Sequence, residues 1–186
     1  MTAANALTLS RLLATPFVVW LMYGQSPAAR YGALALFIVA MLTDVFDGLL
    51  ARRAGPTPLG NYLDPVADKV LILCLFLCLA DRGLLPLWMG LIQLGREMLV
   101  SGVRDAAAAS GRVIGANWMG KTKTLLQTAT VAFGLLLLAR HGLRTAAPAD
   151  ADWAYNALWG LGAATTAASV AFAAAFLWRR RAVFTQ

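Results

Sequence analysis

Apolar segments long enough to cross a lipid bilayer follow one another through almost the whole chain, separated by short connections rich in glycine, proline and charge. Spanning the hydrocarbon core takes roughly 20 mostly apolar residues in a helix. Because 60% of the 186 residues are hydrophobic and only 13% are charged, the sequence favours an all-α integral membrane protein over a soluble one. We therefore expect one membrane domain over residues 1–186.

Six transmembrane helices are expected along this domain. They are predicted over residues 7–23, 30–53, 60–80, 84–103, 118–139 and 153–178. The first is expected to start as a short N-terminal interfacial helix, and the fourth to continue as a polar extension as far as Ala109. The connection between the second and third contains Pro56 and Pro58 and is predicted to be a loop.

Lysine and arginine gather at one side of the expected spans. That side receives ten of them: Arg11, Arg52, Arg53, Arg104, Arg112, Lys121, Lys123, Arg179, Arg180 and Arg181. The other side receives four: Arg30, Arg82, Arg140 and Arg144. The positive-inside rule then predicts that both termini are cytoplasmic. We read the net charge of +7 as topology and contact with anionic lipid headgroups, not nucleic-acid binding, because no basic helix or base-stacking platform is evident.

Four aspartates interrupt the apolar pattern within the stretch DVFDGLLARRAGPTPLGNYLDPVADK. Asp44 and Asp47 are three residues apart, and Asp64 and Asp68 are four apart, so each pair shares a face of a helix. The two helices are consecutive and antiparallel, and we expect the two faces to converge near the cytoplasmic end. Four carboxylates in a low dielectric need a cation to neutralise them. One or two Mg²⁺ or Mn²⁺ ions are the economical choice, because these hard ions prefer oxygen ligands.

Small residues between the acids leave room for a ligand to approach the backbone. They are Gly48, Ala51 and Gly60, and Arg52 beside them can bind a phosphate with two hydrogen bonds. A pair of metal ions in such a place can neutralise a diphosphate and stabilise both oxygens of an in-line displacement. The alternative is that the acids only form ion pairs with neighbouring arginines and Lys69, but ion pairing does not require small residues between the acids.

The residues from Asp44 to Arg52, followed by those from Gly60 to Asp68, resemble the signature of the CDP-alcohol phosphatidyltransferases. In one-letter code the pattern is D-x-x-D-G-x-x-A-R, then G-x-x-x-D-x-x-x-D. The resemblance implies an integral membrane enzyme, usually with six transmembrane helices and often a homodimer. The stretches NALTLSR, GREMLVSGVRDAAAASG and GKTKT are similar to the phosphatidylglycerophosphate synthases within this family.

The resemblance also implies a reaction and a role for each matching residue. The hydroxyl of an acceptor attacks the phosphorus that bears diacylglycerol in CDP-diacylglycerol, and CMP leaves. By analogy, the metal ions are held by Asp44, Asp47, Asp64 and Asp68, and Asp68 is also the catalytic base. The CDP moiety is expected to contact Gly48, Ala51, Arg52 and Gly60, together with Asn5, Thr8 and Arg11.

Basic residues between the fourth and fifth predicted spans favour a phosphorylated acceptor, glycerol 3-phosphate, over a neutral alcohol. The candidates for its phosphate are Arg104, Lys121, Lys123 and Arg112. Arg96 and Glu97 are expected to pair with each other or across helices. Another acceptor (inositol phosphate, serine or phosphatidylglycerol) is an alternative, as is a cation transporter, which would need more ionisable residues deep in other spans. We expect a bacterial inner-membrane protein with its active site facing the cytoplasm.

Overall fold

The computed structural model describes residues 3–54, 58–109, 118–142 and 152–179. Side chains at 3–8, 44–54, 58–65, 68, 109, 118 and 119 lie outside the description. The described residues form the helices α1 (Ala3–Met22), α2 (Pro27–Ala54), α3 (Pro58–Asp81), α4 (Leu87–Ala109), α5 (Trp118–His141) and α6 (Asp152–Arg179). No strand occurs in these ranges. The expected all-α class is confirmed, and each helix coincides with one predicted from the sequence.

Helix length and composition mark two segments as long and apolar enough to cross a membrane, Gly120–His141 in α5 and Asp152–Arg179 in α6. Shorter apolar helical segments cover Leu9–Met22 and Pro27–Thr43. Large apolar side chains are also exposed on the outside of the bundle, including Leu13, Phe17, Val39, Leu91 and Leu125. Such a surface suits contact with lipid. That all six helices cross the membrane stays a prediction.

The N-terminal interfacial helix expected from the sequence is not a separate element. α1 is one continuous helix of 20 residues, although it contains Pro16. Proline inside a helix removes one backbone hydrogen bond. The turn before the proline gains another bond, because the hydroxyl of Thr15 donates to the carbonyl of Arg11 at 3.1 Å.

Most helix starts differ from the prediction by a few residues, and for two of them the reason lies in the backbone. α3 begins at Pro58, inside the predicted loop, because proline suits the first turn of a helix, where its missing N–H needs no partner. α4 begins at Leu87 and not at Leu84. The connection before it turns at Gly83, whose φ of 73° is readily adopted only by glycine.

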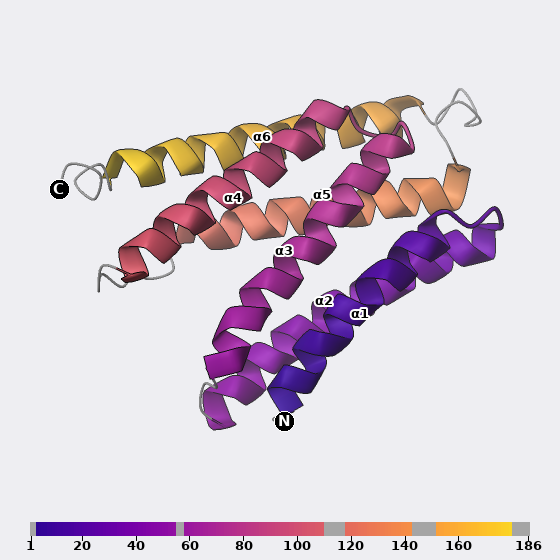
Figure 1. The fold of residues 1–186 in the computed structure, drawn as a ribbon. Helices are drawn as coiled ribbons and strands as arrows, with labels where there is room; N and C mark the ends of the chain where they lie inside the picture. The colour runs from indigo at the N-terminus through magenta and orange to yellow at the C-terminus, as the bar shows by residue number, and fades with distance from the viewer. Residues whose placement is uncertain (1–2, 55–57, 110–117, 143–151, 180–186) are drawn as a thin grey trace.

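Successive helices run in opposite directions (Figure 1). α1 packs against α2 and α3, α5 packs against α2 and α6, and α4 packs against α3 and α6. The core lies between them: Leu71, Leu75 and Leu79 recur every four residues along α3 and are fully buried, with Phe37 of α2 and Leu135 of α5 in the same cluster.

Because successive helices run in opposite directions, their ends form two sets, one at each end of the bundle. One set, which we call the α2/α3 end, comprises the end of α2, the start of α3, and the helix ends on the same side of the bundle (Figure 1). Basic residues described at this end are Arg104, Lys121, Lys123 and Arg179, whereas Arg30, Arg82 and Arg140 lie at the far end. These seven residues lie at the ends predicted for them, whereas Arg112, Arg144, Arg180 and Arg181 lie outside the described residues.

Polar contacts close the far end around the last turn of α1. The hydroxyl of Tyr23 donates to the carboxylate of Asp81 at 2.5 Å. The guanidinium of Arg82 lies 4.0 Å from the centre of the Tyr23 ring and donates to the carbonyl of Met22 at 3.4 Å. Arg30 donates to the carbonyl of Gln25 at 2.8 Å.

The turn between α1 and α2 gives a first prediction. A Cβ added at Gly24 would lie 2.5 Å from the Cβ of Ala29 and 3.0 Å from the carbonyl oxygen of Leu21, and neither can move without moving backbone. We expect Gly24→Ala to lower the free energy of unfolding by about 1–3 kcal/mol. The matched control is Gly160→Ala in α6, where a Cβ would meet nothing within 4 Å. Thermal unfolding in detergent would compare the two, and equal midpoints for both variants would contradict the steric argument.

Candidate active site

The backbone places the two aspartate pairs at matching distances from the connection between α2 and α3. Asp44 lies ten residues before the end of α2 and Asp68 ten residues after the start of α3. Asp47 and Asp64 lie seven and six residues from the same two ends. At the rise of an α-helix, Asp44 and Asp68 each lie about 15 Å along their helices from this connection, and Asp47 and Asp64 about 10 Å. The side chains lie outside the described residues, so convergence of the carboxylates stays a prediction.

The other members of the predicted donor site can be placed only in part. Gly48, Ala51 and Arg52 lie in the last turns of α2 and Gly60 in the first turn of α3, whereas Asn5 and Thr8 lie in α1. Their side chains are also outside the description. Among the side chains that are described, no group of three or more His, Cys, Asp or Glu could hold a metal ion. The four aspartates do not belong to that set, and their oxygen donors fit Mg²⁺ or Mn²⁺.

Arg11 is the one member of the CDP-binding set whose side chain is described, and it is only 2% exposed. The depth of Arg11 in the bundle can be compared with that of the aspartates. α1 and α3 run in the same direction, and the hydrogen bond from Tyr23 to Asp81 aligns their ends. Arg11 lies twelve residues before Tyr23, and Asp68 thirteen before Asp81, so the two positions are at nearly the same level. A buried guanidinium needs hydrogen-bond or ion-pair partners, so the burial and depth of Arg11 fit its predicted place beside the acidic site.

The acceptor side of the predicted site is a network of buried charges between α4, α5 and α6. Lys123 of α5 pairs with the carboxylate of Glu97 of α4. The same carboxylate oxygen accepts a hydrogen bond from Arg96 at 2.7 Å, so the pairing expected for Arg96 and Glu97 is confirmed. Arg96 also donates to the carbonyl of Ser169 in α6 at 3.2 Å.

The remaining acceptor candidates are placed differently from one another. Arg104 lies with its guanidinium 5.6 Å from the centre of the Phe176 ring, between α4 and α6. Lys121 is exposed on α5. Arg112 lies outside the described residues. The structure therefore brings Lys123 and Arg104 to the helix interface and leaves Lys121 at the surface.

Lys69 belongs to this network, although the sequence suggested for it only an ion pair with the aspartates. Its ammonium donates to the hydroxyl of Ser101 in α4 at 2.6 Å. Arg104, Asp105 and Arg96 are near enough to act on it electrostatically. The signal available in the sequence was its place directly after Asp68. We call Lys69, Arg96, Arg104 and Lys123, with Glu97 and Asp105, the cationic cluster.

Uncharged hydrogen bonds continue from the cationic cluster toward the far end. Gln127 of α5 donates to Gln93 of α4 at 2.9 Å, and both side chains are buried. Thr130 of α5 and Thr165 of α6 share a hydrogen bond of 2.9 Å. Polar pairs in an apolar bundle hold neighbouring helices in one register, because a shifted helix would leave these groups without partners.

An apolar helical bundle with two pairs of acids on consecutive helices and buried basic residues is typical of a membrane protein with a polar site. The family model described as CDP-alcohol phosphatidyltransferase matches residues 1–178. The chain belongs to this family, and it is thus an integral membrane phosphatidyltransferase. Enzymes of the family generally depend on a divalent metal.

Curated relatives agree with the family assignment. The chain is 46% identical over 143 residues to the "Probable phosphatidylglycerophosphate synthase" of Mycobacterium tuberculosis. The matched region covers 75% of this chain and 67% of that protein. It is 37% identical over 139 residues to a CDP-diacylglycerol–glycerol-3-phosphate 3-phosphatidyltransferase of Rickettsia bellii, covering 74% and 76% of the two chains. The protein of the same name from Bacillus subtilis is 34% identical over 145 residues, covering 71% and 75%.

The buried ion pair gives a second prediction. Glu97→Gln would leave Lys123 and Arg96 without their carboxylate, and we expect it to lower the free energy of unfolding by about 3 kcal/mol. Combined with Lys123→Met, the loss should be clearly smaller than the sum of the two single losses, because both remove one interaction. Unfolding by dodecyl sulfate in mixed micelles measures this, with the exposed Lys121→Met as the control. Additive losses would show that the two side chains do not interact.

Proposed function

We propose that the chain transfers the phosphatidyl group of CDP-diacylglycerol to glycerol 3-phosphate, giving phosphatidylglycerophosphate and CMP. The names of the relatives from Rickettsia bellii and Bacillus subtilis describe this donor and this acceptor. The structural observation that carries the choice of acceptor is the cationic cluster, which lies beside the α3 residues of the donor site.

The cationic cluster has more positive than negative charge. Among the described side chains, four basic residues, Lys69, Arg96, Arg104 and Lys123, lie near two acids, Glu97 and Asp105, so the basic groups are in excess. Asp105 is exposed, so its charge is screened by solvent, whereas Lys123 and Glu97 are buried. A phosphate monoester would compensate this excess. A neutral alcohol would bring no charge to compensate it.

The donor would bind where α1, α2 and α3 meet at the α2/α3 end. Gly48, Ala51, Arg52 and Gly60 would contact the CDP moiety, with Asn5, Thr8 and Arg11 on the nucleotide side. Asp44, Asp47, Asp64 and Asp68 would hold two Mg²⁺ or Mn²⁺ ions, which when bound neutralise the diphosphate and stabilise charge on the reacting oxygens.

Asp68 would act as the base. It takes the proton from the acceptor hydroxyl while the new oxygen–phosphorus bond forms and the phosphorus–oxygen bond to CMP breaks. A carboxylate is a weak base for an alcohol, so its contribution depends on proximity. Asp68 and Lys69 are consecutive in α3, and Lys69 contacts α4. Asp68 and Lys69 thus lie at the same depth of the bundle, and a phosphate bound near Lys69 would hold the acceptor at the depth of Asp68.

We place the α2/α3 end at the cytoplasmic face of a bacterial inner membrane, because the described lysines and arginines are more numerous there than at the far end. We also propose a homodimer, as the family resemblance suggests. The single membrane domain over residues 1–186 remains part of the same proposal.

The third prediction tests the reaction itself. Purified protein with CDP-diacylglycerol and Mg²⁺ or Mn²⁺ should release CMP when glycerol 3-phosphate is added, and much more slowly with inositol phosphate, serine or phosphatidylglycerol. Chelation by EDTA should stop the release. Asp68→Asn is the inactive control, expected to slow turnover by at least about a hundredfold while it still binds CDP-diacylglycerol. CMP release with inositol phosphate but not with glycerol 3-phosphate would show that glycerol 3-phosphate is not the acceptor, while the phosphatidyl transfer reaction itself would still hold.

The fourth prediction compares two lysines. Lys69→Met removes a cation that the cluster contributes beside Asp68, so the KM for glycerol 3-phosphate should rise by about ten- to a hundredfold, which corresponds to a lost charge-assisted hydrogen bond. The KM for CDP-diacylglycerol should change little. Lys121→Met removes an equal charge from an exposed position and should leave both constants within about twofold. A larger effect at Lys121 than at Lys69 would place the acceptor phosphate elsewhere.

A further inference from the structure

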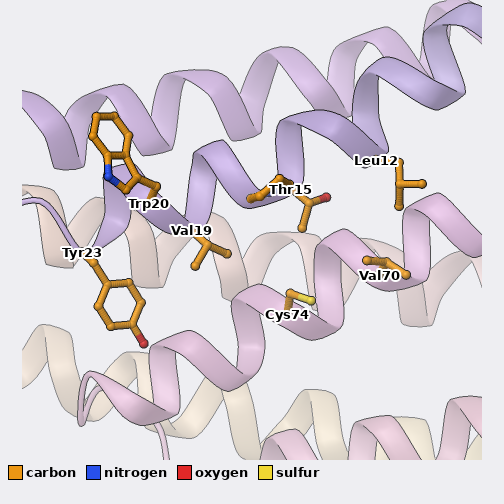
Figure 2. Close-up of a pocket in the computed structure, with 8 residues that line it drawn as sticks. Leu12, Thr15, Val19, Trp20, Tyr23, Val70 and Cys74 are labelled. Atoms are coloured by element: carbon orange, nitrogen blue, oxygen red, sulfur yellow. The ribbon is translucent and has the colours of Figure 1, made fainter.

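An apolar groove runs along the outside of the bundle between α1 and α3. Its volume is about 650 Å³. Val70 and Cys74 on α3 face the α1 residues from Leu12 to Tyr23 (Figure 2). The lining is almost wholly apolar, and its two hydroxyls are engaged elsewhere, since Thr15 donates to the carbonyl of Arg11 and Tyr23 to Asp81. The groove therefore offers carbon surface and almost no hydrogen bonding.

The groove begins next to the candidate site. Leu12 directly follows Arg11 in α1, and Val70 lies two residues after Asp68 in α3. At its other end the groove reaches Tyr23, which is fixed by its hydrogen bond to Asp81 and by the guanidinium of Arg82. From Leu12 to Tyr23 the length is about 16 Å at the rise of an α-helix. An apolar channel of this length thus connects the level of the reacting groups with a polar stop.

We propose that this groove binds one fatty acyl chain of the CDP-diacylglycerol substrate, with its glycerol end at Leu12 and Val70 and its methyl end toward Tyr23. The proposal rests on the proposed function, because the diphosphate must lie at the level of Asp68 for the chain to enter at that end. Continuity with the acidic site favours a substrate chain over a randomly bound lipid. A second protein helix fits less well, since the groove ends at polar groups.

A bound chain has consequences for how the groove selects substrates. Each methylene buried along α1 and α3 adds to affinity, so a long chain should bind more tightly than a short one. A short chain would fill only the part beside Leu12 and Val70. Val19 lies further along the groove and would contact only a longer chain. The groove should therefore act as a specificity determinant for the lipid and not for the acceptor.

The fifth prediction compares a long acyl chain, which would reach Val19, with a short one, which would not. Val19→Trp fills the distal half of the groove, so it should raise the KM for dipalmitoyl CDP-diacylglycerol by about tenfold and leave that for the dihexanoyl substrate within about twofold. The matched control is Val39→Trp on α2, which is 54% exposed and outside the groove. It should change neither KM. Equal effects on both substrates in Val19→Trp, or equal effects of the two variants, would overturn the proposal.

A binding measurement on the wild-type protein separates failure of the groove from failure of the proposed reaction. Cys74 lines the groove, whereas Cys78, one turn further along α3, packs against the core. In detergent, dipalmitoyl CDP-diacylglycerol should slow the alkylation of Cys74 by N-phenylmaleimide by about fivefold or more relative to Cys78, as read by peptide mass spectrometry. The dihexanoyl lipid should protect less. Unchanged Cys74 reactivity would reject the groove even if CMP is released, and protection without CMP release would reject only the reaction.

Discussion

The carboxylate of Glu97 lies between the ammonium of Lys123 and the guanidinium of Arg96, in a part of the bundle with little contact with solvent. Because Arg96 also donates to a carbonyl of α6, this one carboxylate joins three helices. Removing a charge from such a network is costly, since its partners stay buried. The register of α4, α5 and α6 therefore depends on the same charges that give the cationic cluster its excess of positive charge.

α3 connects the two halves of the candidate site. Its apolar face, with Leu71 and Leu75, fills the core, and its start carries half of the aspartate signature. Lys69 reaches Ser101 on α4. A helix fixed on both sides, by α1 and by α4, keeps donor and acceptor positions at a constant separation. In a phosphoryl displacement the protein contributes mainly such positioning, together with electrostatic stabilisation.

Much of the fold could be predicted because apolar periodicity and breaks determine helices in a membrane chain. The six helices and the pairing of Arg96 with Glu97 followed from local pattern. Lys69 did not, because its contact with Ser101 joins positions 32 residues apart, and helical spacing says nothing about which face meets another helix. The start of α3 at Pro58 was also missed, since proline is equally typical of a loop and of a first helical turn.

The groove between α1 and α3 opens sideways, with Trp20 72% exposed beside it. A lipid can then enter by diffusing in the plane of the bilayer, and its chain never has to leave a hydrocarbon environment. A water-soluble acceptor must arrive by another route, from the α2/α3 end. The two substrates would thus approach from perpendicular directions and need not displace each other, so that the rate of supply of the lipid depends on its density within the membrane and not on its concentration in water.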